Sequence, residues 1–151
     1  MSAELLDLVL AVLHHLLVFL LAGLLAAQMV LLGGALTPQS IDRLSRVDRF
    51  YGGVAGLVLV VGAGRLFWGL KGWEFYVYNW PFWAKLGVFL TVGLLSVLPT
   101  TRFLAWKRQA DADPSSTVSR EDHVRVKRIV HGEAALFALI PILAAIMARA
   151  F

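Results

Sequence analysis

The chain is built from four long blocks of apolar residues that are separated by short polar stretches. The blocks cover roughly residues 5–32, 50–70, 82–104 and 129–150. A helix of about 20 apolar residues spans the hydrocarbon core of a bilayer. The strands of a membrane barrel would instead show period-two alternation, which these blocks lack. The pattern therefore predicts an all-α protein, a four-helix transmembrane bundle that forms a single domain.

Composition supports this class. Hydrophobic residues make up 59% of the 151 residues and charged residues only 16%, and the mean hydropathy is +0.74. A soluble domain carries more charge than this. The first block follows Glu4 and Asp7 instead of a basic region, so we expect no cleavable signal peptide. The absence of cysteine excludes thiolate metal sites, iron–sulfur clusters and disulfides.

Lysine and arginine predict the orientation of the bundle. Ten of the 14 basic residues lie in two of the connections and the helix ends beside them: Arg43, Arg46, Arg49, Arg102, Lys107, Arg108, Arg120, Arg125, Lys127 and Arg128. Cytoplasmic loops carry such an excess, so both termini and the 71–81 loop are expected outside. The same topology explains the pI near 9.9 without nucleic acid binding.

The connections have features of their own. Residues 71–83 are rich in Trp and Tyr, which prefer the headgroup layer, and an aromatic belt is the simplest interpretation. Residues 109–118 read as a linker. Ser119 with Asp122 resembles a capping box, so the last helix is predicted over 121–150.

Ionisable or strongly polar residues inside membrane helices are costly and therefore mark candidate functional positions. At about 100° per residue, Asp7, His14 and Gln28 share one face of the first helix. His15 falls on a neighbouring stripe of small residues that would allow close packing, so both histidines can face the bundle. The candidates are His14, His15, Gln28, Arg65, Lys85, His131 and Glu133.

The other helices carry polar residues on definite faces. Arg65 shares a face of the second helix with Tyr51 and Gly62. Gly52 and Gly56 form a GxxxG motif on a different face, which suggests a second helix contact. In the last helix, His131 and Glu133 point in nearly opposite directions.

Depth divides these residues into two groups. His14, His15, Arg65 and Lys85 fall in the outer half of the predicted bundle, whereas His131 and Glu133 fall near the cytoplasmic end. At a rise of about 1.5 Å per residue, the groups lie roughly 20 Å apart. One haem held by both His15 and His131 is therefore not expected.

The outer group has a chemistry that fits haem. An imidazole between bundle helices is a common axial ligand, and Arg65 and Lys85 could pair with the propionates. A quinone site and a proton or copper path are alternatives. In a purely structural interpretation, the histidines bond neighbouring helices and the basic side chains reach the headgroups. His131 and Glu133 lie close to the basic membrane surface, which favours a structural role for them.

Several strings of the chain resemble a bacterial family of four-helix membrane proteins that is known only as predicted and of unknown function. The resemblance covers nearly the whole chain, and it implies an acidic residue where this chain has Gln28. The strings are Gly64–Gly72, Phe75–Tyr76, Asn79, Phe82–Leu86, His14–Leu16, Leu95–Thr100, Ile140–Pro141 and Met147–Arg149.

More distantly, the chain is similar to HemJ-type protoporphyrinogen oxidases and CopD-type copper-resistance proteins. Both place a histidine early in the first helix and a Trp/Lys element at the start of a later one, here His14 or His15 and Lys85. This similarity implies haem b or copper.

Together, these observations predict a protein of the bacterial inner membrane that binds haem b through His14 or His15. An accessory subunit or small transporter with structural polar residues is the alternative, and copper handling is the third interpretation. The expected partners are the lipid bilayer and a second copy of the chain or a larger membrane complex. Three methionines and no cysteine count against copper(I).

Overall fold

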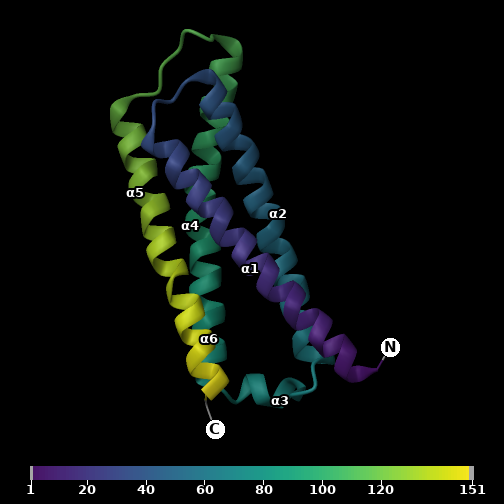
Figure 1. Ribbon diagram of the computed structural model, residues 1–151. Helices are drawn as coiled ribbons and strands as arrows, with labels where there is room; N and C mark the ends of the chain where they lie inside the picture. Colours follow the sequence, from purple (N-terminus) through teal and green to yellow (C-terminus); the bar gives the residue numbers. More distant parts are fainter. Residues whose placement is uncertain (1, 150–151) are drawn as a thin grey trace.

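The computed structural model describes residues 2–149, and helices are the only regular secondary structure over them (Figure 1). Four segments are long and apolar enough to cross a membrane: α1 (Ala3–Gly33), α2 (Pro38–Trp68), α4 (Trp80–Ala112) and the pair α5 (Arg120–Phe137) with α6 (Leu139–Arg149). A short helix, α3 (Gly72–Val77), joins α2 to α4. The predicted all-α class and the four-helix bundle are confirmed.

The ends of α2 and α5 differ from those that the apolar blocks indicate. α2 begins at Pro38 instead of Phe50, because Thr37 caps it by accepting a hydrogen bond from the Ser40 N–H and Pro38 suits the first turn. The last span breaks after Phe137. Pro141 lacks an N–H and its ring crowds the carbonyl four residues earlier, which is that of Phe137.

Two connections follow from local chemistry. Ser119 caps α5 by accepting a hydrogen bond from the Asp122 N–H, as the sequence indicates. In the linker, two hydrogen bonds from Ser115 to the Asp113 carboxylate lower the pKa of that group below its ordinary value. At the start of α3, Gly72 has a φ of +72°, a left-handed conformation that glycine adopts without steric cost.

Side-chain contacts join the helices at one end of the bundle, and the helices diverge at the other end. At the end that holds the α1–α2 and α4–α5 connections, here called the basic end, side chains join the helices in pairs. His123 donates to the Leu32 carbonyl at 2.8 Å, Trp106 donates to Asp122 at 3.0 Å, and Lys107 lies 3.4 Å from Asp42. These links connect α5 to α1, α5 to α4, and α4 to α2.

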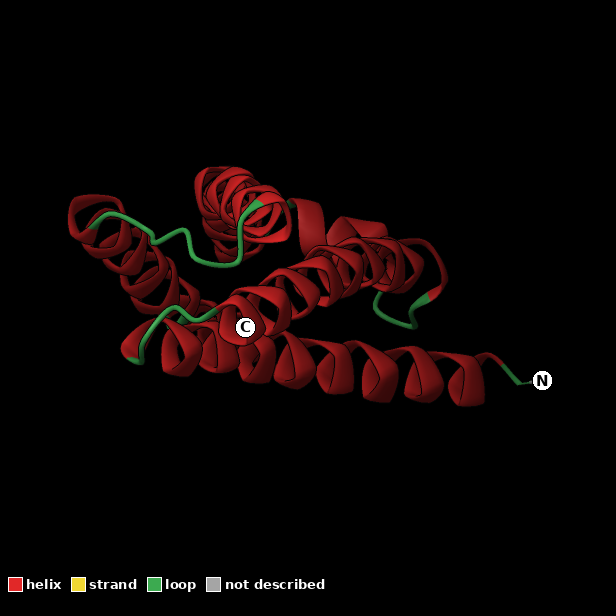
Figure 2. Ribbon diagram, turned by 90° about the horizontal axis from the view of Figure 1, so that it is seen from above, coloured by secondary structure: helices red, strands yellow, loops and turns green. Residues whose placement is uncertain are grey.

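At the opposite end, here called the α3 end, the helices diverge. α1 packs along α2, and α6 packs on α4, while over residues 2–149 α1 contacts neither α4 nor α6. The start of α1 and the end of α6 lie well apart in both views (Figures 1 and 2), and α3 lies between α2 and α4 at this end (Figure 1). The Trp83 indole donates to the Val77 carbonyl, while Trp73, Tyr78 and Trp80 are exposed. This distribution fits the interfacial position predicted for residues 71–83.

The apolar core lies in the half of the bundle nearer the basic end. Its fully buried members come from all four spans and include Leu21, Leu32, Leu44, Phe103, Val126 and Val130. The GxxxG glycines do not contribute to it. Gly52 and Gly56 are exposed, and a Cβ at either position would meet nothing within 4 Å. The helix contact predicted for them is therefore not made within this chain.

We expect Trp106→Phe to destabilise the protein, because the indole N–H of this buried residue donates to the Asp122 carboxylate. A hydrogen bond to a charged group contributes about 1.5–3 kcal/mol. The free energy of unfolding, measured by steric trapping in lipid bicelles, should fall by that amount. Trp68→Phe is the matched control, since Trp68 is 65% exposed, and it should change stability by less than about 0.5 kcal/mol. Equal losses in the two variants would contradict the structure at the basic end.

Candidate functional site

The polar face of α1 lies against α2 along its whole length. The Leu70 N–H donates to Asp7 at 3.4 Å near the α3 end. His14 lies against Gly62, where a Cβ would come within 3.3 Å of the imidazole ring. Gln28 donates to Asp48 at 3.3 Å nearer the basic end. The face predicted from helical spacing is therefore the seam between α1 and α2.

His14, Arg65 and Lys85 form a cluster at the α3 end, here called the His14 cluster. His14 of α1 lies against Gly62 of α2, one turn before Arg65, and Lys85 lies near the start of α4 at the same end of the bundle. His14 Nδ1 and Arg65 Nε are both buried, and neither has a hydrogen-bond partner. A ring nitrogen of this kind can ligate a metal, and an unpartnered guanidinium N–H can bind an anion.

His15 lies beside His14, with ring centroids 6.2 Å apart, but it is on the outer side of α1. Its side chain is exposed, and its ring donates to the Ala11 carbonyl of the same helix at 2.6 Å. Adjacent helical positions point about 100° apart, so only one of the two neighbours can face α2. The small-residue stripe that carries His15 faces outward, as exposed Ala26 and Gly33 show.

A second group of polar side chains, here called the polar core, lies inside the bundle toward the basic end. Asp48 Oδ1 accepts hydrogen bonds from the Gln28 amide and, at 3.0 Å, from the Thr100 hydroxyl. Tyr51 is 4% exposed, and the charges of Asp48 and Glu133 both act on it. The polar core therefore joins one polar group or more from each of α1, α2, α4 and α5.

Glu133 and His131 lie at a similar depth, but they have different surroundings in the structure. Glu133 is 0% exposed and belongs to the polar core. His131 is exposed, and its ring donates to the Lys127 carbonyl at 2.7 Å. The opposite directions predicted for these side chains are correct. Glu133 is therefore part of the interior, while His131 is on the outer surface of α5.

Asp48, Thr100 and His123 are interior polar residues that the sequence interpretation missed. Asp48 lies before the apolar block of α2, but it stands one turn ahead of Tyr51 and so continues the face of Tyr51 and Gly62. That spacing could have identified it. Thr100 and His123 carry no comparable signal, because their partners come from other helices.

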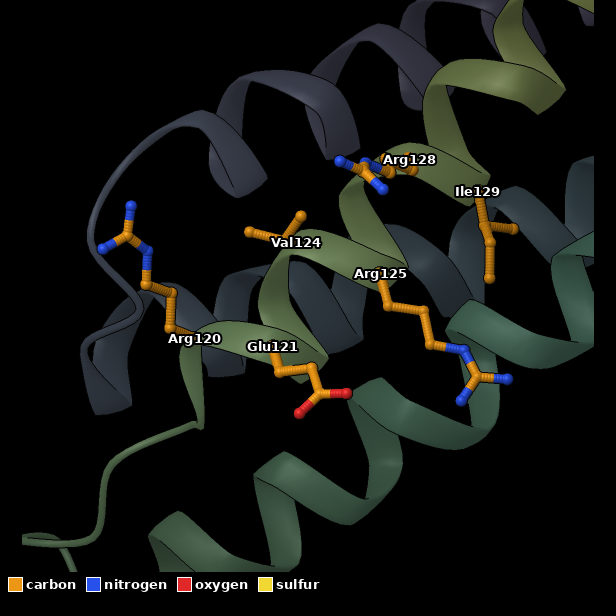
Figure 3. Close-up of a pocket in the computed structure, with 6 residues that line it drawn as sticks. All are labelled: Arg120, Glu121, Val124, Arg125, Arg128 and Ile129. Atoms are coloured by element: carbon orange, nitrogen blue, oxygen red, sulfur yellow. The ribbon is translucent and has the colours of Figure 1, made fainter.

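The exposed surface of α5 near the basic end carries a shallow hollow (Figure 3). Its side chains include three arginines, Arg120, Arg125 and Arg128, which point in different directions in the close-up. Arginines spread in this way do not converge on one ligand. They suit a surface beside anionic lipid headgroups.

We expect Thr100→Val to weaken the polar core, because it removes one of the two hydrogen bonds to Asp48 without changing the shape of the side chain. Hydrogen bonds between membrane helices contribute roughly 0.5–2 kcal/mol. The same unfolding measurement should show a loss of that size. Thr101→Val is the control, because Thr101 is exposed and bonds only the Leu98 carbonyl of its own helix. A neutral Thr100→Val would show that Thr100 does not bond Asp48 in the membrane.

The model of a family described as "Predicted membrane protein (DUF2214)" matches residues 6–151. No curated protein and no solved structure matches the chain.

Proposed function

Since the chain belongs to this family of membrane proteins, we propose that it binds haem b at the His14 cluster and is redox-active. One observation carries the proposal. His14 Nδ1 and Arg65 Nε are buried polar atoms without partners, and His14 lies against Gly62, one turn before Arg65 on α2. Such atoms are costly unless something binds them.

The residues of the cluster fit the parts of a haem. His14 would hold the iron through its imidazole, and Arg65 and Lys85 would bind the propionates through charge-assisted hydrogen bonds. His15 and His131 are exposed and bond their own helices, so His14 is the histidine that suits the iron best. When bound, haem would supply one-electron chemistry. The protein would hold it and exclude water.

The alternative is an accessory subunit or small transporter in which the polar residues are structural. The mutual hydrogen bonding of Gln28, Asp48 and Thr100 favours it, because such bonds stabilise helix packing in membranes. Copper bound at His14 is the third candidate. We further propose that the protein is an oligomer in which Gly52 and Gly56 of α2 pack against a second copy, since both are exposed on the bundle surface.

We also propose that the protein lies in the bacterial inner membrane with the basic end in the cytoplasm. The excess of lysine and arginine at that end supports this orientation. The start of α1 and the end of α6 would then face outward, and the His14 cluster would lie in the outer half of the membrane.

The haem proposal predicts a spectrum that depends on His14. Full-length protein in lipid nanodiscs, supplied with haem and then reduced, should give a Soret band and sharp visible bands. His14→Ala should abolish them, whereas His15→Ala, its exposed neighbour, should leave them unchanged. Arg65→Gln should weaken haem binding roughly tenfold, which corresponds to the loss of one charge-assisted hydrogen bond of about 1.4 kcal/mol.

Other outcomes would favour the other candidates. Wild-type protein without haem bands, in which His14→Ala changes only stability, would contradict the proposal and favour a structural role. Copper found by metal analysis in the wild type, and lost in His14→Ala, would favour copper handling.

The orientation has a direct test because the chain contains no cysteine. A single Tyr78→Cys should react with an impermeant maleimide in intact spheroplasts, since Tyr78 is 82% exposed at the α3 end. Ser115→Cys, in the α4–α5 connection, should react only after the membrane is lysed. The reverse pattern would place the basic end outside.

A further inference from the structure

Glu133 presents an interior carboxyl group to which nothing donates. The residue is 0% exposed, and neither Oε1 nor Oε2 has a hydrogen-bond partner. None of the ion pairs found over residues 2–149 includes Glu133 or Asp48. Moving a carboxylate from water to such a place costs several kcal/mol. An ionised Glu133 would therefore need a cation.

The neighbouring Asp48 carboxylate makes an ionised Glu133 still more costly. The Gln28 amide and the Thr100 hydroxyl both donate to Asp48, so its negative charge is stabilised. Asp48 and Glu133 are 7% and 0% exposed, and both lie in the polar core. Two carboxylates that share a low-dielectric site oppose each other's ionisation, which means that the pair can readily hold only one negative charge.

Among residues 2–149, no cationic side chain pairs with Asp48 or Glu133. The groups around the pair are Gln28 from α1, Tyr51 from α2 and Thr100 from α4, all of them neutral. His131, on the same helix as Glu133, lies on its outer face. One turn toward the basic end, Leu44 precedes Asp48 and Val130 precedes Glu133, and both are 0% exposed. These two apolar residues lie between the Asp48–Glu133 pair and the arginines at the basic end.

From this arrangement, we propose that Glu133 and Asp48 form a binding site for one exchangeable proton, which resides on Glu133. A proton needs one oxygen, whereas a metal cation such as Mg²⁺ or Ca²⁺ needs six or more ligands. The proton is taken from water and returned to water, so no other reactant is required. The site is separate from the His14 cluster and does not depend on haem.

Infrared spectroscopy of the haem-free, full-length protein in lipid nanodiscs tests the proposal. At neutral pH, the spectrum should contain the C=O band of one protonated carboxylic acid, distinct from the carboxylate bands. In protein made with ¹³C-labelled glutamate, the band should move to lower frequency, which assigns it to glutamate without any substitution. Glu133→Gln should abolish the band. Glu121→Gln, an exposed glutamate on the same helix, should keep it.

The other results would overturn the proposal. A wild-type spectrum without the band, or a band that does not move on glutamate labelling, would mean that Glu133 is not protonated. A band that disappears when Na⁺ or K⁺ is added at constant pH would show that the site takes a metal cation instead. A band that persists in Glu133→Gln would place the proton elsewhere.

Discussion

The two hydrogen bonds that Asp48 accepts determine how this bundle is arranged. Gln28 donates from α1 and Thr100 from α4, and both bond the same oxygen of a residue on α2. Three helices are thereby joined at one point. In the apolar interior of a membrane, helices gain little from burying apolar surface against one another, and interhelical hydrogen bonds and close packing fix their positions. The apolar core surrounds this point, and the helices diverge away from it.

As a result, the two halves of the seam between α1 and α2 differ in how far their polar side chains are hydrogen-bonded. Toward the basic end, the polar side chains satisfy one another, except for Glu133. Toward the α3 end, His14 Nδ1 and Arg65 Nε lack partners. The hydrogen bonds toward the basic end hold the helices together, while the unpartnered groups toward the α3 end are available for a ligand. The proton proposed at Glu133 would neutralise the remaining unpartnered group toward the basic end. The haem proposed at His14 would bind the unpartnered groups toward the α3 end.

The sequence predicts the fold well because each membrane span must be a long apolar helix. It also predicts the inner face of α1, since Asp7, His14 and Gln28 recur at helical spacing. It does not choose between His14 and His15, because that choice depends on the rotation of α1 against α2. It also misses Asp48, whose position before the apolar block suggests a surface residue. The extension of α2 back to Pro38 brings Asp48 inside the bundle.

The sequence also does not predict hydrogen bonds between residues on distant helices. Thr100 is 52 residues from Asp48, and His123 is 91 residues from Leu32. No local pattern links such pairs, because they meet only after the helices pack. The split between Glu133 and His131 is different, since two positions along one helix point in nearly opposite directions whatever the packing. Geometry alone therefore predicts that one of them is interior, but not which one.

A double-mutant cycle on Gln28 and Asp48 tests the central interaction most directly. The free energy of unfolding in bicelles would be measured for the wild type, Gln28→Leu, Asp48→Leu and the double variant. Residues in contact show a coupling energy of roughly 0.5–3 kcal/mol, and we expect a stabilising value in that range. Additive losses within about 0.3 kcal/mol would mean that the two side chains do not meet in the membrane, which would contradict the arrangement of α1 and α2 described above.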